Sequence, residues 1–152
     1  MTNPDDSVTG ACRCGVTRFR LTRRPLVTMA CHCTGCQKMT ASAFSLSALY
    51  PLAAFALIEG APVIGGLHGP DARHHFCPHC LSWIYTRFAA PDEFVNVRAT
   101  MLENAADFVP FVETWTAEKL AWAATPAVHS FADFPPMERY PDLLAEYAAR
   151  RG

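Results

Sequence analysis

Apolar and polar residues alternate in short runs along most of the chain, and Gly, Pro and other turn residues separate these runs. Alternation with a period of two is typical of strands with one buried face, and β-branched and aromatic residues favour the same conformation. Phe44, Leu46 and Ala48, for example, alternate with serines. The pattern predicts strands within residues 10–22, 26–33, 42–50, 61–66, 72–77, 82–88, 93–99 and 110–116.

Turn and helix signals complete this pattern. Residues 67–71, with the sequence LHGPD, are typical of a hairpin turn, and residues 34–40 are expected to form a short helical turn. The C-terminal sequence YPDLLAEYAARRG predicts a capping helix, because Pro141 and Asp142 suit its first turn and Glu146 and Arg150 are one turn apart. Short strands followed by one helix indicate a mainly β fold of antiparallel sheets.

Length and charge restrict the organisation and the partners. The chain has 152 residues, of which 51% are hydrophobic and 18% charged, which suits a single domain over 1–152 with one core. The formal net charge is −1, and Lys and Arg form no long run. Because nucleic acids and anionic membranes are recognised by dense basic patches, we expect neither as a partner.

The sequence also predicts a compartment. The N-terminal MTNPDDSVTG carries acidic residues where a secretory signal needs positive charge and an apolar core. Residues 39–58 lack charge, but the serines and Pro51 within them favour a half-buried strand over a membrane span. We therefore expect a cytoplasmic, reducing location, where cysteines favour metal binding over disulfides.

All seven cysteines fall into three groups with C-x-C or C-x-x-C spacing. Such spacings let thiolates converge on one cation from a tight turn, and zinc suits sulfur ligands because it is redox-inert and tetrahedral. The odd number excludes complete disulfide pairing. The groups are Cys12 and Cys14; Cys31, Cys33 and Cys36; and Cys77 and Cys80.

The seven ligands divide into four and three in two ways. In the first, the middle group forms an open three-cysteine site, and the other four cysteines close a structural site. In the second, Cys33 and Cys36 join Cys77 and Cys80 as a zinc ribbon. Spacing favours the first, because the middle group can reach one ion from a single turn.

Three motifs, GACRCGVTRF, CHCTGCQKMTASAF and FCPHCLSWIY, occur in this order and resemble the glutathione-dependent formaldehyde-activating enzyme family, which includes the centromere protein V relatives. The resemblance spans about residues 9–125, which leaves about 136–152 as a C-terminal helical cap. It implies a β-tent fold of antiparallel sheets around a structural zinc on Cys12, Cys14, Cys77 and Cys80. It also implies a second, open zinc site, which need not be fully occupied, on Cys31, Cys33 and Cys36.

The family's founding reaction joins formaldehyde to the thiol of glutathione and gives S-hydroxymethylglutathione; the reverse reaction breaks the carbon–sulfur bond. An open site suits this chemistry, because a substrate thiol that takes the fourth position ionises there and becomes nucleophilic. The resemblance thus predicts catalytic roles for the three cysteines of the open site, Cys31, Cys33 and Cys36.

Other side chains are candidates for contacts with the substrate. Phe44 is a candidate wall of the site, and Ser42 a candidate hydrogen-bonding group. A basic residue is expected to offset the carboxylates of a glutathione adduct, and Lys38 is favoured over Arg73 and Arg98 because it lies two residues past the last cysteine of the open site.

Histidines and tryptophans are given structural roles. His32 lies between two ligands, so its side chain is expected to point away from the metal, and His79 is expected at an exposed tip. Trp83, Trp115 and Trp122 are expected in the core. Three functions remain open: a carbon–sulfur lyase acting on a small thiol adduct, a non-catalytic thiol- or glutathione-binding domain, and a structural zinc domain. The oligomeric state is left open.

Overall fold

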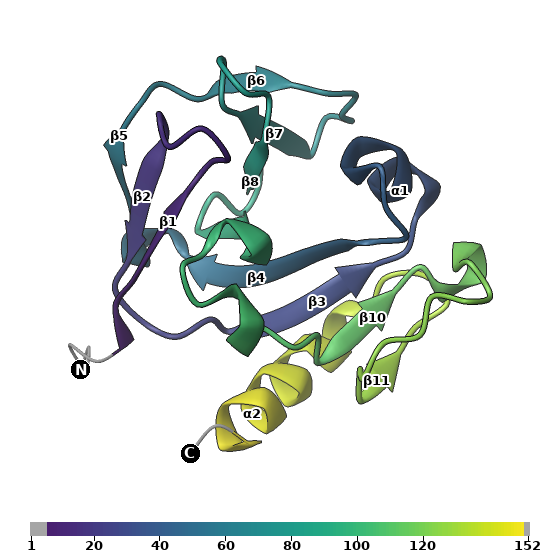
Figure 1. Cartoon of the computed structure of the whole chain (residues 1–152). Coiled ribbons are helices and arrows are strands. Elements are labelled where there is room, and N and C mark those ends of the chain that lie inside the picture. Colours follow the sequence, from purple (N-terminus) through teal and green to yellow (C-terminus); the bar gives the residue numbers. More distant parts are fainter. Residues whose placement is uncertain (1–5, 151–152) are drawn as a thin grey trace.

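Two β-sheets and a C-terminal helix make up most of the structure, a computed structural model that describes residues 6–150 (Figure 1). The smaller sheet is antiparallel and has the order β1-β2-β5. Its strands are β1 (Val8–Ala11), β2 (Arg18–Leu21) and β5 (Phe55–Glu59). The fold is therefore mainly β, as predicted.

The segment predicted as one strand, 10–22, is divided between β1 and β2. The backbone N–H of Cys12 donates to the carbonyl of Thr17 at 3.0 Å, and Gly15 adopts φ +80°. A tight turn that contains Cys12 and Cys14 therefore interrupts the run. The single-strand prediction is wrong because the local pattern does not show that the chain folds back on itself here. Strand β5 was not predicted.

The larger sheet has eight strands in the order β11-β10-β3-β4-β9-β8-β7-β6. These strands are β3 (Val27–Cys31), β4 (Ser45–Pro51), β6 (Val63–Gly65), β7 (Ala72–Phe76), β8 (Trp83–Phe88), β9 (Phe94–Arg98), β10 (Val112–Thr114) and β11 (His129–Ser130). Strands β6 and β7 form the predicted hairpin. All of these strands except β11 coincide with predicted segments, and β4 extends one residue beyond its segment, to Pro51.

One edge of this sheet is parallel, which corrects the prediction of purely antiparallel sheets. Strand β10 runs parallel to β3, and β11 runs parallel to β10. A parallel pair needs a long crossover connection, and here the segment between β3 and β10 supplies it. The larger sheet is therefore mixed.

Two α-helices and several short 3₁₀ turns accompany the sheets. Helix α1 (Thr34–Thr40) coincides with the predicted helical turn, and α2 (Tyr140–Arg150) matches the predicted C-terminal helix. Short 3₁₀ turns, η2 to η6, cover Leu52–Ala54, Ala99–Met101, Ala105–Asp107, Thr116–Glu118 and Met137–Arg139. Within residues 6–150 the helices are all too short or too polar to cross a membrane.

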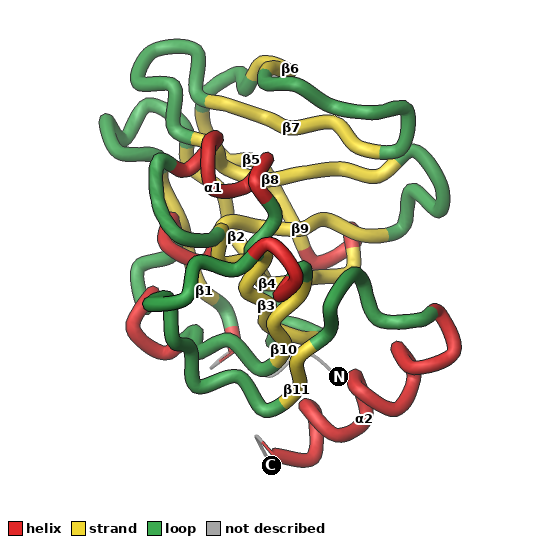
Figure 2. The backbone as a smooth tube through the Cα atoms, turned by 90° about the vertical axis from the view of Figure 1, so that its right-hand side faces the viewer, coloured by secondary structure: helices red, strands yellow, loops and turns green. Residues whose placement is uncertain are grey.

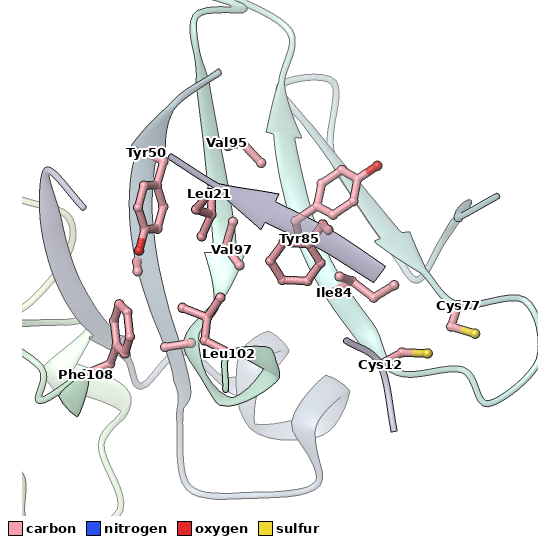
Figure 3. Packing of buried hydrophobic residues seen from close by; sticks show 13 residues of the cluster. Cys12, Leu21, Tyr50, Cys77, Ile84, Tyr85, Val95, Val97, Leu102 and Phe108 are labelled. Atoms are coloured by element: carbon pink, nitrogen blue, oxygen red, sulfur yellow. The ribbon is translucent and has the colours of Figure 1, made fainter. Parts of the chain in front are cut away.

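Helix α2 packs beside β3 and β10, where Leu143 and Tyr147 are buried with Val27, Phe111 and Val112 (Figures 1 and 2). The two sheets enclose a second, larger cluster. Its members include Phe19, Leu21, Tyr50, Ile84, Val95, Val97, Leu102 and Phe108. Cys12 and Cys77 lie at one edge of the same cluster (Figure 3).

Both faces of β4 are covered. The predicted apolar face packs into the main cluster, where Ala48 and Tyr50 are buried and Leu46 is half-buried. The opposite face is covered too, since Ser45 and Ser47 are 2% and 3% exposed. The Ser47 hydroxyl lies 3.5 Å from the carbonyl of Met29, and Ser45 contacts a cysteine of the α1 region.

Candidate metal centres

Two turns from different sheets bring four cysteines together. Cys12 and Cys14 lie in the turn between β1 and β2, and Cys77 and Cys80 lie in the turn between β7 and β8. The Sγ atoms of these four cysteines all lie within 4.8 Å of one another. The Sγ atom of Cys14 is 3.5 Å from that of Cys12 and 3.8 Å from that of Cys77.

The four-cysteine group fits a tetrahedral metal ion. Zinc–sulfur bonds of about 2.3 Å separate tetrahedral sulfurs by about 3.8 Å, close to the spacing seen here. The Thr17 backbone N–H donates to Cys12 Sγ at 3.3 Å, and Ser82 Oγ lies 3.2 Å from Cys80 Sγ. These contacts orient the ligands, as outer partners do in metal sites. The group can therefore hold a metal ion with four protein ligands.

The second turn of this group is a compact knuckle. The Leu81 backbone N–H donates to the Cys77 carbonyl, and the Cys77 N–H to the Ser82 carbonyl, both at 3.0 Å. Leu81 adopts φ 58°, in the left-handed region that favours glycine. His79 is exposed at the tip, as predicted.

The three remaining cysteines gather where β3 meets α1. Cys31 ends β3, Cys33 caps α1 by accepting the Cys36 backbone N–H at 3.3 Å, and Cys36 lies in the first turns of the helix. Their sulfurs lie within 4.8 Å of one another. Among residues 6–150 no His, Cys, Asp or Glu atom joins them as a fourth ligand. The grouping is therefore four plus three, and the zinc-ribbon alternative does not form.

When no metal ion is bound, hydrogen bonds between the thiols of this group shift the pKa values of Cys31 and Cys36 in opposite directions. A hydrogen bond from Cys36, with further ones from the Cys33 backbone and Thr114, outweighs burial and lowers the pKa of Cys31 to about 5. The same contact with Cys31, together with burial, raises the pKa of Cys36. Thiolates are the metal-binding form, so one sulfur of the group is ready to bind a cation at neutral pH.

Ser45 was missed by the sequence reasoning, which chose Ser42. The Ser45 hydroxyl donates to Cys36 Sγ at 3.1 Å, whereas Ser42 is exposed. Ser45 is also the register partner of Cys31 in the β3–β4 pair. That pairing is the signal that points to Ser45, because it places the residue beside the cysteines.

The three basic candidates have different environments. Lys38 is exposed on α1. Arg73 donates to backbone carbonyls of its own hairpin turn, those of Gly69, Pro70 and Ala72. Arg98 is 5% exposed; its register partner on β4 is Ser47, and Ser45, on the same face of that strand, pairs with Cys31. Arg98 is therefore a buried cation on the face of the sheet that carries Cys31.

The Arg98 guanidinium stacks on Trp83, with its central carbon 4.0 Å from the ring centre. Burial lowers the pKa of Arg98 to about 10, and Cys36 and Cys31 oppose this decrease when they are ionised, so the side chain stays charged at neutral pH. Trp83 is buried, as predicted, and Trp115 is half-buried. Trp122 is 75% exposed, so its core prediction is wrong; it lies in a turn beyond the sheet.

His32 is fully buried and lies outside both cysteine groups, as expected of its position between two ligands. Its Nε2 lies 3.0 Å from Oε2 of Glu113 on β10, and its ring lies 5.3 Å from that of Phe44. Phe44 is half-buried, in contact with this ring. The segment that carries the cysteines is thereby attached to β10.

The Glu113 carboxylate accepts further hydrogen bonds, from Lys119 Nζ at 3.0 and 3.1 Å, Thr125 Oγ1 at 2.9 Å and Ser130 Oγ at 2.7 Å. Burial by itself raises the pKa of this carboxyl, but the hydrogen bonds together outweigh burial and lower the pKa to about 2. Sequence reasoning missed this hub, because its members are scattered along the chain and carry no motif.

Gln37 attaches α1 to the segment that follows β10. Its side-chain amide donates to the carbonyl of His32 at 2.7 Å and to that of Glu118 at 3.0 Å. The position of α1, and with it that of Cys36, is therefore fixed by hydrogen bonds to His32, which precedes the helix, and to the segment after β10.

Comparisons with known proteins support a family assignment. The family model described as glutathione-dependent formaldehyde-activating enzyme matches residues 7–118, more than half of the chain and including all seven cysteines. The crystal structure of a Rhodobacter sphaeroides protein is similar in fold, with a TM-score of 0.52 and 21% identity. The similarity covers 62% of this chain and 87% of that chain. No curated protein matches the sequence.

Proposed function

This chain belongs to the glutathione-dependent formaldehyde-activating enzyme family, and we propose that it is a zinc-dependent carbon–sulfur lyase for a small thiol adduct of the S-hydroxymethylglutathione type. The reaction breaks the bond between sulfur and the hydroxymethyl carbon, and the hydroxyl proton moves to the sulfur. The products are the free thiol and formaldehyde, and the reverse reaction forms the adduct.

The observation that carries this proposal is the three-cysteine group with three protein sulfurs and no fourth protein ligand among residues 6–150. Catalytic zinc sites have this composition, whereas structural sites use four protein ligands. Cys31, Cys33 and Cys36 would hold the catalytic zinc. When bound, zinc makes a substrate thiol ionise at neutral pH and so supplies a nucleophilic thiolate.

The four-cysteine group is proposed to hold a structural zinc at the junction of the two sheets, as in a β-tent. Burial supports this role, since Cys12 and Cys77 are 4% and 0% exposed and belong to the main hydrophobic cluster. The loss of that zinc would leave sulfur atoms unpaired at the edge of the core.

The chain's own residues hold the open site in place. Ser45 donates to Cys36 Sγ, and the His32–Glu113 contact anchors the segment between Cys31 and Cys33. We propose that Lys38 and Ser42, both exposed on or just after α1, contact the peptide part of the adduct, and that half-buried Phe44 forms a wall. The proposed partner is a small thiol such as a glutathione adduct, encountered in the cytoplasm.

The test is the rate of S-hydroxymethylglutathione formation and breakdown, followed by exchange NMR with and without protein. We expect acceleration by the wild type and none by Cys33→Ala, with similar melting temperatures for both proteins. Thiol binding without acceleration would indicate a non-catalytic binding domain. A decrease in melting temperature for Cys33→Ala as large as that for Cys77→Ala would indicate that the three-cysteine group is structural.

A further inference from the structure

Arg98, the last residue of β9, is a buried cation without a carboxylate partner. Its side chain is 5% exposed, and none of the ion pairs formed by residues 6–150 includes it. Its Nε is buried with no hydrogen-bond partner, and its Nη2 lies 3.5 Å from the carbonyl of Asn96. A buried charge is costly unless another group compensates it, so this position requires an explanation.

The surroundings of Arg98 fix its position. The guanidinium stacks on Trp83, whose indole N–H donates to the hydroxyl of Thr86 at 3.2 Å. The same hydroxyl lies 2.9 Å from Nδ1 of His74, and the His74 ring contacts the Trp83 ring at 5.0 Å. Strands β7, β8 and β9 therefore hold the cation in one place.

The three-cysteine group lies on the same face of the larger sheet as Arg98. Arg98 is the register partner of Ser47 on β4, and Ser45, two residues away on the same face of that strand, is the register partner of Cys31. Three thiolates around a divalent cation leave one net negative charge, and an anionic fourth ligand adds another. Lys38 is exposed, where solvent and salt screen its charge, so Arg98 is the cation that can offset this excess.

We propose that Arg98 is the buried counter-charge of the three-cysteine group and makes its fourth position selective for anionic ligands, thiolates above all, over neutral ones. The inference rests on the proposed function for the presence of the metal and names the ligand class that this site prefers. Arg98 acts through the field at the site and is a positioning residue.

The experiment compares ligands of different charge on protein loaded with Co²⁺, whose absorption spectrum reports changes at the fourth position. Azide serves as an anion without a thiol, 2-mercaptoethanol as a thiol that ionises on binding, and imidazole as a neutral ligand. Arg98→Met removes the charge, and Arg98→Lys retains it. Arg87→Met is the matched control, because Arg87 lies on the neighbouring strand β8 and pairs with Asp92.

We expect Arg98→Met to weaken azide and thiol binding by about tenfold or more, while imidazole binding changes by less than about twofold. Arg98→Lys should keep most of the preference for anions, and Arg87→Met should behave like the wild type. Equal weakening for all three ligands, or no weakening, would overturn the proposal. If Arg98→Met does not fold, loss of the preference for anions in folded Arg98→Lys overturns it as well.

The ligand-binding result does not depend on whether the protein catalyses the lyase reaction. A preference for anions that depends on Arg98, in a protein that does not accelerate adduct exchange, supports the counter-charge and rejects the lyase. Acceleration of exchange with no dependence of ligand binding on Arg98 supports the lyase and rejects the counter-charge.

Discussion

Nε2 of His32 lies 3.0 Å from Oε2 of Glu113, although 81 residues separate the two in the sequence. The contact joins the segment between Cys31 and Cys33 to β10, the parallel edge of the larger sheet. Glu113 also binds Lys119, Thr125 and Ser130, so a single buried carboxylate holds several segments together.

Glu113→Gln should lower the free energy of unfolding by about 3 kcal/mol, because it leaves Lys119 without its counter-ion and removes acceptors for buried donors. Urea unfolding followed by circular dichroism measures this. The matched control is Glu103→Gln at an exposed position, which should change stability by less than about 0.5 kcal/mol. Similar effects of the two substitutions would contradict the role of Glu113 as a hub.

The same carboxyl predicts an acid dependence of stability. Its folded-state pKa of about 2 lies below the reference value of 4.5, so the ionised form stabilises the fold fully above pH 4.5. That contribution is lost as pH falls through about 2 and amounts to roughly 3 kcal/mol. The wild type should therefore lose its advantage over Glu113→Gln between pH 4.5 and 2. An advantage that stays constant over this interval would contradict the prediction.

Chelation should remove two metal ions in separate steps. The three-cysteine group offers three ligands, and all three are half-buried. The other group offers four ligands, and two of them are buried. A chelator should therefore empty the three-cysteine group first, with little change in melting temperature, and the second step should unfold the protein. Metal analysis and thermal melting at increasing chelator concentration measure both steps. Simultaneous loss of both ions would refute this order.

Substitution by glycine at two positions should stabilise the protein. Ala41, which ends α1, has φ 51°, and Leu81 has φ 58°; both side chains are exposed. Left-handed backbone costs about 1 kcal/mol for residues other than glycine, so Ala41→Gly and Leu81→Gly should each raise stability by about that amount. The control Ala145→Gly lies on the exposed face of α2 and should lower stability by about 1 kcal/mol. Thermal melting distinguishes the opposite signs.

Local features of the fold were predictable from the sequence. The helical turn at 34–40, the hairpin formed by β6 and β7, and the C-terminal helix all follow from residue preferences within a few positions. The same holds for the close approach of Cys31, Cys33 and Cys36, since their spacing lets one turn gather them. The roles of these cysteines in metal binding and catalysis stay predictions.

Long-range features were not predictable in this way. The division of 10–22 into two strands, the strand β5 and the parallel pairing of β10 with β3 depend on segments far apart in the sequence. The exposure of Trp122 and the burial of Ser45 depend on which neighbours the folded chain supplies. Periodicity describes one segment at a time, so it cannot identify these neighbours.

The sequence by itself determined the mainly β class, the family resemblance and the ligand types, because strand propensity and cysteine spacing are local properties. Only the tertiary structure decided which four cysteines and which three come together. It also decided that Ser45 contacts Cys36, that Glu113 anchors His32, and that Arg98 is the buried cation. The physical reason is that burial and charge compensation depend on distances between segments, and folding alone sets those distances.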